Sequence, residues 1–283
     1  MKLIKILGLF MLSFWSAQNT RFVYQVSMAT DTTNLANKTV ENAYLDVDGK
    51  KSYFYSEKNL QRDSIMERMR TTRNFSFQQM ENFRSKIDYV IQKDIPNQNI
   101  LFKTRIGRDS YSYTEKPDFS WKILPETATI GEYKTQKAET QYGGRTWYAW
   151  FTPEIPVQDG PYKFSGLPGL IVKVQDQNAD FSFDLMQTKK ISQLQEPSFR
   201  GQTIEVKKSK FLTLQKDFQK DPSSFFNSQR SGGGGFGGPR GSGGGNNGIA
   251  PPAPPGMDAN RMKEMQQRML EEVKSNNNPI ELK

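Results

Sequence analysis

The chain has no histidine and no cysteine among its 283 residues. Without histidine it cannot form a Ser-His-Asp or Cys-His catalytic group, a zinc site with imidazole ligands, or a haem site with an axial imidazole. Without cysteine it has neither a disulfide nor a thiol that could be acylated, so packing alone must stabilise the fold. The reactive groups that remain are carboxylates, lysines and tyrosines, whose use in catalysis depends on shifted pKa values.

The chain also lacks a long apolar segment. Residues 1–17 carry two lysines, a short apolar run and a small final residue, Ala17, and this pattern predicts a secretory signal peptide. The run is too short to span a bilayer, and no later stretch reaches the ~20 apolar residues that a transmembrane helix needs. We therefore expect no transmembrane anchor, and a location in the periplasm or at the outer-membrane periphery of a Gram-negative envelope, or outside the cell.

The excess of basic residues, +9 overall, is spread along the chain rather than clustered. Dispersed charge favours solubility, and contact with anionic envelope surfaces is the alternative. The glycine-rich stretch that begins at Ser231 lacks the Lys-Ser or Lys-Thr of a phosphate-binding loop, and its arginines are limited to Arg240 and the preceding Arg230. We expect no nucleic-acid partner.

Alternation of apolar and polar residues is the strongest pattern that the chain does have. It marks strands such as Phe22–Met28, Ala43–Val47 and Leu170–Val174. From residue 63 to 84 the apolar spacing becomes helical, and Ser64-x-x-Glu67 resembles a capping box. The sequence predicts a mainly β fold of the β-rich α+β class: a curved antiparallel meander sheet forming a half-barrel or barrel-like core, with a helical insertion near residues 63–84 and a C-terminal helix after a disordered linker.

Composition divides the chain into four parts. Residues 1–17 are the signal peptide and residues 18–229 a single β-rich domain. Residues 230–256 form a Gly/Pro-rich flexible linker, since they hold too little apolar surface to offset their chain entropy. Residues 257–283 form an amphipathic helix and an extended tail. We expect this last part to dock on the main domain, because so short a helix is marginally stable alone.

Three methionines of this last helix share one face, namely Met262, Met265 and Met269. Their thioethers could dock the helix into an irregular groove. They could also bind Cu(I), which prefers soft sulfur ligands. Both readings stay open.

The segment from Thr152 to Gly169 is long for a loop and carries four prolines. We interpret it as a structural corner or as a recognition surface, with two tryptophans leading into it from opposite faces of one strand. No catalytic residue is predicted. The candidate binding residues are Arg145, Trp147, Trp150, Lys163, Phe164, Leu167 and Pro168.

The runs Gly144–Thr152 and Gly160–Ile171, the second of which ends in Gly-Leu-Pro-Gly-Leu-Ile, resemble the GLPGLI family of exported proteins, which has no settled function. The similarity extends from Trp121 to Leu185 and, more loosely, to the closing Asn278–Lys283. Within the motif, Pro168-Gly169 is typical of the centre of a type II turn, with a positive φ at the glycine.

The resemblance implies a partner, and this chain differs from many relatives at one position. Relatives are often associated with TonB-dependent outer-membrane transporters, so such a transporter is the expected envelope partner. Many relatives have cysteine where this chain has Thr135. A thiol-based role in the family therefore cannot operate here.

Three functional hypotheses follow. The first is a non-enzymatic envelope binding or accessory protein, with residues 152–169 as the recognition rim, an apolar cavity for an apolar ligand, or an outer-membrane partner. The second is a periplasmic Cu(I)-handling protein that uses the methionine helix. The third, a carboxylate-based hydrolase using residues such as Glu126, Glu132, Glu154 and Asp176, rests on no motif.

Overall fold

A computed structural model describes residues 19–72, 82–107, 109–197, 202–222 and 259–282. The predicted signal peptide and the predicted linker lie outside these residues. Among the residues described, no helix is long and apolar enough to cross a membrane. The strands are β1 (Thr20–Met28), β2 (Thr39–Val47), β3 (Lys51–Ser56), β4 (Tyr89–Asp94), β5 (Asn99–Ile106), β6 (Asp109–Glu115), β7 (Lys122–Ile130), β8 (Tyr133–Tyr142), β9 (Arg145–Thr152), β10 (Leu170–Asp176), β11 (Phe181–Lys190) and β12 (Thr203–Glu205), and the helices are α1 (Glu57–Thr72), α3 (Lys208–Lys220) and α5 (Ala259–Ser275).

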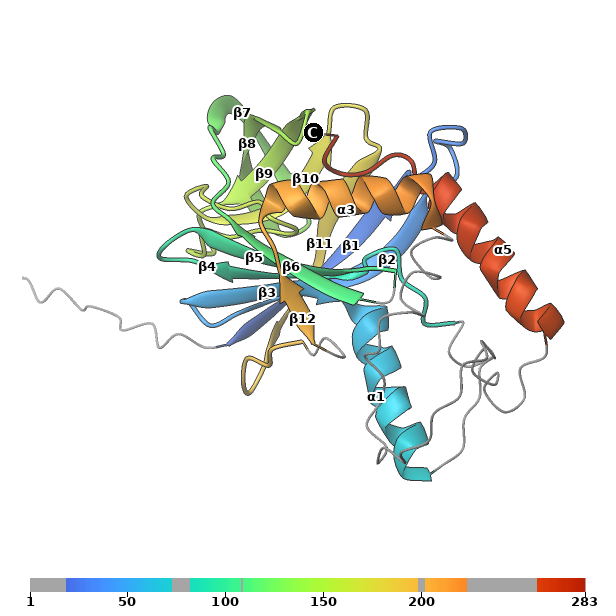
Figure 1. Ribbon diagram of the computed structural model, residues 1–283. Coiled ribbons are helices and arrows are strands. Elements are labelled where there is room, and N and C mark those ends of the chain that lie inside the picture. The colour runs from blue at the N-terminus through green and yellow to red at the C-terminus, as the bar shows by residue number, and fades with distance from the viewer. Residues whose placement is uncertain (1–18, 73–81, 108, 198–201, 223–258, 283) are drawn as a thin grey trace, which may run out of the picture.

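The twelve strands form one curved, unclosed sheet, which confirms the predicted mainly β class (Figure 1). Its order is β12-β6-β5-β4-β3-β2-β1-β11-β10-β9-β8-β7. The sheet is thus built from two meanders, β1–β6 and β7–β11, that meet where β1 pairs with β11. Every pairing is antiparallel except that of β12 with β6. The predicted curved antiparallel meander is thus divided in two, because the contact between β1 and β11 joins strands that lie far apart in the chain.

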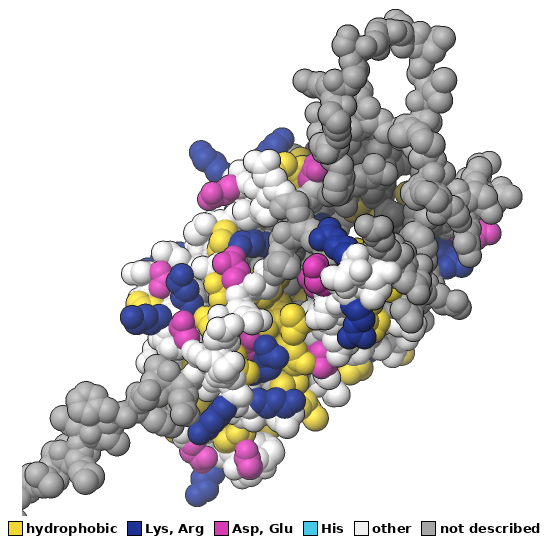
Figure 2. All heavy atoms as spheres, turned by 90° about the horizontal axis from the view of Figure 1, so that it is seen from below, with side chains coloured by type: hydrophobic (Ala, Val, Ile, Leu, Met, Phe, Trp, Pro, Cys, Tyr) yellow, Lys and Arg dark blue, Asp and Glu magenta, His cyan; other side chains and the backbone are white. Residues whose placement is uncertain are grey.

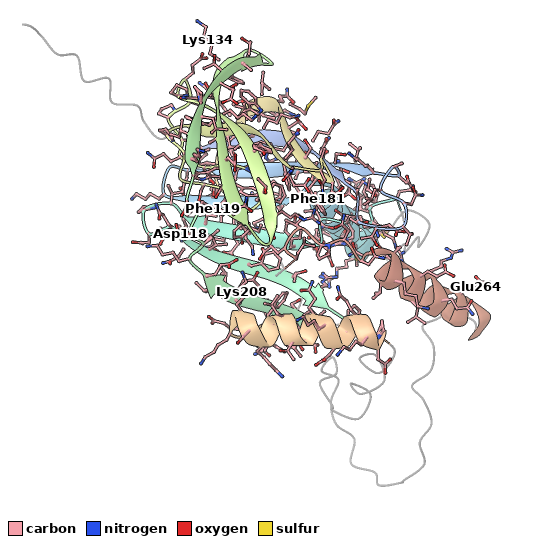
Figure 3. The ribbon with its side chains drawn as sticks, turned by 90° about the horizontal axis from the view of Figure 1, so that it is seen from above. Asp118, Phe119, Lys134, Phe181, Lys208 and Glu264 are labelled. Carbon is pink, nitrogen blue, oxygen red and sulfur yellow. The ribbon has the colours of Figure 1, made fainter. Side chains whose placement is uncertain are left out.

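The sheet curls enough to bring its two ends near each other. Strand β6 lies next to one end and β7 forms the other, yet only residues 116–121 connect them. A chain of this length reaches roughly 25 Å at most. Figure 3 shows Asp118 and Phe119 on this connection, while Lys134 lies at the far tip of the β7–β8 hairpin. The result is a half-barrel whose open seam is bridged by a short loop.

Aromatic side chains fill the concave face of the sheet. The period-2 face of β1, from Phe22 to Met28, is almost fully buried, as its alternation predicted. Phe164 of the β9–β10 connection packs against Trp147 in a tilted arrangement, with ring centroids 4.7 Å apart. Phe119 of the seam contacts the same ring at 5.5 Å. These contacts place the β9–β10 connection inside the half-barrel.

Helix α1 begins at Glu57, earlier than the capping pattern suggested. The Ser56 hydroxyl accepts a hydrogen bond from the backbone N–H of Asn59 (3.3 Å), which is the geometry of an N-cap. Ser64 instead lies inside the helix and donates to the carbonyl of Leu60. The helix is therefore started by the residue that ends β3, and the predicted cap at Ser64 is wrong. Residues 73–81, the rest of the predicted insertion, lie outside the described residues.

The Gly-Leu-Pro-Gly-Leu-Ile segment makes a tighter turn than predicted. Gly169 has the expected positive φ, +146°. Its N–H donates to the carbonyl of Leu167 (2.8 Å), whereas the N–H of Leu170 donates to Ile155. The turn is thus closed by a three-residue hydrogen bond centred on Pro168 rather than by the four-residue bond of a type II turn.

Candidate functional site

Residues 277–282, which we call the tail, lie across one end of the half-barrel (Figure 1). There they meet the end of β1, the β8–β9 and β10–β11 turns, the β9–β10 connection and the start of α3. We call these surroundings the tail site. Backbone bonds hold both ends of the tail: the N–H of Asn278 donates to Thr30 (2.9 Å), and that of Leu282 donates to Gly143 (2.6 Å).

Arg145, at the start of β9, binds the backbone of the tail. Its Nε donates to the carbonyl of Ile280 (3.1 Å), and Nη2 donates to the carbonyl of Pro279 (2.9 Å) and to the side-chain oxygen of Asn278. The guanidinium is 7% exposed. A planar, buried fork of donors fixes the path of an extended chain more closely than a flexible ammonium would.

Two aspartates of the β10–β11 turn orient Arg145. Its Nη1 donates to Asp176 (2.8 Å) and to Asp180 (3.2 Å). All five guanidinium N–H groups therefore have acceptors. The carboxylates keep the cation paired, so its charge is compensated inside the protein.

Asn278 is the first buried side chain of the tail. It is 5% exposed, and its amide nitrogen donates to the carbonyl of Ala29 (2.7 Å) and to Asp180 (3.2 Å). Before it, the side-chain oxygen of Asn277 accepts two bonds from Thr32, each of 2.8 Å. The site therefore satisfies both the donor and the acceptor of one specific amide side chain.

Glu281 is the second side chain of the tail that enters the site, and 12% of it is exposed. Its carboxylate pairs with Lys163, accepts a bond from the Tyr162 hydroxyl (2.6 Å), and lies 3.2 Å from the ammonium of Lys208 at the start of α3. Burial alone would raise the pKa of Glu281, but Lys163 and Lys208 outweigh that effect and hold the pKa at about 2. Glu281 is thus bound as an anion.

Lys163 is fully buried and forms ion pairs with two carboxylates, those of Glu115 and Glu281. Its ammonium lies 2.5 Å from Glu115 of β6, donates to the Tyr113 hydroxyl (2.8 Å) and faces the ring of Phe102 (4.7 Å). Lys208 also reaches Glu115 at 2.5 Å. Two lysines and two glutamates therefore form one closed ion cluster, with Glu281 as the member that the tail supplies.

The backbone at Tyr162 is held in a conformation that non-glycine residues rarely adopt. Its φ is +54°, and the residue is 4% exposed. Such a conformation costs of order 1–3 kcal/mol and persists where the surroundings impose it. Here it directs the Tyr162 hydroxyl and the adjacent Lys163 towards Glu281. Burial raises the pKa of Tyr162 well above its usual value, so the phenol stays a donor.

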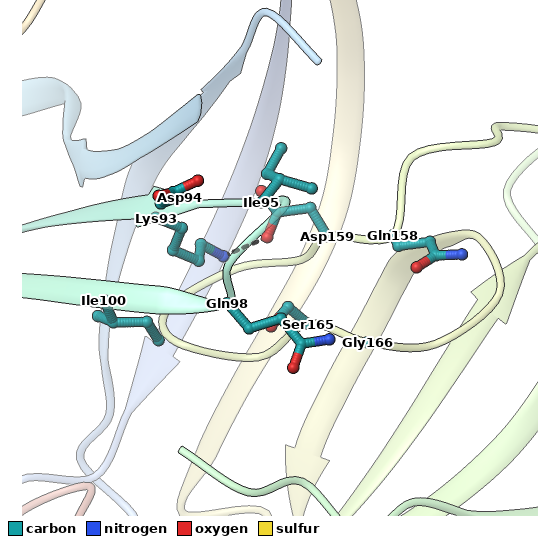
Figure 4. A pocket seen from close by; sticks show the side chains of 9 residues that line it. All are labelled: Lys93, Asp94, Ile95, Gln98, Ile100, Gln158, Asp159, Ser165 and Gly166. Carbon is teal, nitrogen blue, oxygen red and sulfur yellow. Dashed lines mark hydrogen bonds and ion pairs between the residues drawn. The ribbon is translucent and has the colours of Figure 1, made fainter. Parts of the chain in front are cut away.

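A second buried lysine anchors the β9–β10 connection to the sheet (Figure 4). Lys93 of β4 pairs with Asp159 and donates to the carbonyls of Gly160 (2.6 Å) and Phe164 (3.3 Å). Burial lowers the pKa of Lys93, and Asp159 opposes that shift. A pocket of about 20 Å³ beside them has room for about one water. This anchor holds the connection that carries Tyr162 and Lys163.

The structure brings together only part of the predicted binding set. Arg145 and Lys163 meet at the tail site, while Trp147, Phe164 and Leu167 belong to the aromatic core. Trp150 is half-buried beside Lys137, and Pro168 is exposed. Residues 159–164 of the connection are buried, whereas Pro153, Glu154, Pro156 and Gln158 are exposed, so the recognition rim at residues 152–169 stays a prediction.

The larger of two described pockets, about 400 Å³, lies outside the half-barrel between α1 and strands β3–β5. We call it the α1 pocket. It is not the apolar cavity that the sequence analysis expected, since charged groups from both sides line it. They are Arg62, Asp63, Glu67, Arg70, Asp88 and Arg105. Figure 2 shows that basic and acidic side chains are interspersed over the lower face of the molecule rather than separated by sign.

The remaining candidates do not assemble into a site. The side chains of Met262, Met265 and Met269 lie outside what the structure describes, so the Cu(I) hypothesis stays a prediction. Among the described residues, no group of three or more potential ligands is placed to hold a metal ion. Asp176 is occupied by Arg145, and Glu154 accepts a bond from the backbone of Lys134.

Sequence reasoning missed most of the tail site. The residues that it missed come from six separate parts of the chain, and the one available signal was the similarity of the closing Asn278–Lys283 to relatives. The missed residues are Glu115, Tyr142, Tyr162, Asp180, Lys208, Asn278 and Glu281.

Residues 139–173 match a family described as a protein of unknown function (Porph_ging). The match spans β9 and the β9–β10 connection, so it contains both Arg145 and Lys163. No curated protein matches the chain.

The fold is similar to that of PNGF-II, solved in two crystal forms. The P21 form has a TM-score of 0.52 and 17% identity, over 70% of this chain and 33% of that one. The C2 form has a TM-score of 0.51 and 18% identity, over 70% and 32%. The chain thus corresponds to about a third of PNGF-II, and at this identity the likeness shows the fold alone.

Proposed function

We propose that this protein is a non-enzymatic binding or accessory protein of the cell envelope, and that its half-barrel recognises a segment of polypeptide. The observation that carries the proposal is the engagement of Arg145. This buried guanidinium donates to two backbone carbonyls and one side chain of the tail. Among the described residues, the tail site therefore already binds a segment of polypeptide, namely the tail of the same chain.

The same site favours binding over catalysis. A catalytic group needs a substrate beside it and a pKa suited to proton transfer. At the tail site the charged groups instead pair with one another, and the tail occupies the space around them. The filled aromatic interior likewise favours a protein partner over an apolar ligand.

The envelope location and the partner rest on the sequence. The predicted signal peptide and the resemblance to the GLPGLI family support export to the periplasm or the outer-membrane periphery. The same resemblance supports a TonB-dependent transporter as the partner. The buried part of residues 152–169, which carries Tyr162 and Lys163, then shapes the tail site, and the exposed part is the proposed recognition rim.

Fractionation and a direct binding measurement test this proposal. Cells that produce the full chain should yield, in the periplasmic or outer-membrane fraction, a protein whose mass lacks about the first 17 residues. That protein should bind a purified TonB-dependent transporter of the same envelope in biolayer interferometry, and the heat-unfolded protein should not. An unprocessed chain confined to the cytoplasm contradicts the proposal. So does substrate turnover that Asp176→Asn abolishes while the fold stays intact.

A further inference from the structure

We infer that the tail site is a peptide-binding site that also accepts, from another chain, an extended segment of the pattern Asn-Pro-apolar-Glu. In this view the tail is a tethered competitor for that segment. The inference rests on the proposed function, because it names the class of partner that the binding protein takes. Its ligand is a peptide end or loop with one buried amide and one buried carboxylate, three residues apart.

The first reason is that the backbone contacts and the side-chain contacts of the tail have different roles. Backbone groups of the tail bond to Arg145, Thr30 and Gly143, and such contacts are available to any extended chain. The polar side chains that the tail inserts into the site are those of Asn278 and Glu281, while Asn277 bonds to Thr32 at the exposed edge. In an extended segment these positions lie roughly 10 Å apart. The site thus has two side-chain pockets on a shared backbone track, as peptide-recognition sites do.

The second reason is the proline between the two pockets. Pro279 has no N–H to satisfy, and its ring fixes φ near the extended value. Its carbonyl is one of the two that accept a hydrogen bond from Arg145, in this case at 2.9 Å. A segment with proline here is ordered before it binds, so it loses less conformational freedom. Ile280 then packs against the core, whereas Leu282 is 53% exposed.

The third reason is charge selectivity in the second pocket. Lys163 and Lys208 face Glu281 and Glu115, so removing the anion at position 281 leaves two lysines with a single carboxylate. A buried cation without a partner is strongly unfavourable. The pocket therefore rejects a neutral glutamine by more than the loss of one hydrogen bond.

The fourth reason is that little besides the tail itself holds this end of the chain among the described contacts. The ion pairs of α5 with the domain join Glu272 to Arg84 (3.6 Å) and to Lys86 (3.1 Å), and all three side chains are partly exposed. Exposed pairs contribute about 0–1 kcal/mol each. If residues 230–256 are the flexible linker that their composition predicts, the tail competes at an effective concentration on the order of 1 mM.

A fluorescent synthetic peptide of residues 276–283 tests the inference on the full mature chain. Wild-type chain should bind it weakly. A chain whose own tail carries Asn278→Ala and Glu281→Gln should bind it roughly a hundredfold more tightly, since the tethered competitor is weakened. Peptide carrying the same two substitutions should not bind either chain. Peptide with Leu282→Ala, at the exposed position, should bind as the native peptide does.

The outcome that overturns the inference is a doubly substituted chain with wild-type near-ultraviolet circular dichroism that binds no peptide, since the tail is then a fixed part of the fold. If the double variant is unfolded, the single variant Glu281→Gln serves, and a failure of peptide to bind it and raise its Tm overturns the inference equally. Peptide binding without transporter binding would leave the inference intact and refute the transporter as partner. Transporter binding without peptide binding would do the reverse.

Discussion

The tail site and the α1 pocket contain the same kinds of charged residue in opposite states. In the tail site, Arg145 and Lys163 are buried and every charge has a close partner. In the α1 pocket, pairs such as Arg62–Asp63 and Arg70–Glu67 are separated by 3.8 Å and partly exposed. The comparison teaches that composition does not make a recognition site. A recognition site also requires that the charged groups are buried and that a fixed scaffold orients them towards one segment.

The largest expected effect comes from removing the scaffold of the tail site. Gly169→Val should prevent folding, because even a Cβ at this position would lie 2.0 Å from the carbonyl oxygen of Thr152 and the φ of +146° is unfavourable for valine. Gly166→Ala is the matched control: its φ is +89° but its Cβ meets open space. We expect this control to lose about 1–3 kcal/mol. Urea unfolding measures both, and equal stability of the two variants would contradict the close approach seen at Gly169.

The next effect contrasts one cation from each region. Lys163→Met should destabilise the fold by about 3–5 kcal/mol, because Glu115 and Glu281 then share only Lys208. Arg70→Met in the α1 pocket should change stability by less than about 0.5 kcal/mol, since its pair with Glu67 is exposed. The free energies of unfolding in urea give both values. Similar losses in the two variants would remove the distinction between the regions.

The smallest effect of the three is a difference in pH dependence. The pKa of Glu281 is held at about 2, so its contribution is complete above its unfolded pKa near 4.5 and is lost as the pH falls towards 2. This amounts to about 3 kcal/mol. Burial raises the pKa of Asp88 in the α1 pocket, so its ionisation opposes folding and acidification relieves that penalty. The two regions should therefore respond to acid with opposite signs.

Single substitutions separate these two contributions. Melting temperatures between pH 7 and pH 2.5 should show a shallower loss of stability for Glu281→Gln than for the wild type. Asp88→Asn should instead be more stable than the wild type near pH 7 and converge with it in acid. Parallel curves for all three proteins would contradict the assigned shifts.

Much of the fold could be predicted because strand alternation is local. The alternation at Phe22–Met28 and the turn at Asp48-Gly49 each identify an element without knowledge of the rest of the chain. Helix α3 was not predicted from the sequence. In the structure its Phe211 packs on Tyr113, with ring centroids 4.9 Å apart. The start of α1 was misplaced because both Ser56 and Ser64 fit a cap, and only the end of β3 decides between them.

The candidate site could be predicted only in part, and for a physical reason. Arg145 stood out because it precedes an unusual connection and Lys163 because it lies within it, but their partners Asp180 and Glu281 are ordinary acidic residues in turn-like or terminal sequence. A long-range ion pair has no local signature, since either member is equally suited to a solvated surface.

By itself, the sequence determined the composition of the reactive groups, the mainly β class and the individual hairpins, because these depend on residue identity and on neighbours a few positions apart. Only the tertiary structure decided that the β9–β10 connection lies inside the half-barrel and that the tail completes an ion cluster there. Both depend on the pairing of β1 with β11, which closes contacts between the two ends of the domain. The energy that decides such pairings comes from burial over the whole sheet, and no short stretch of sequence contains it.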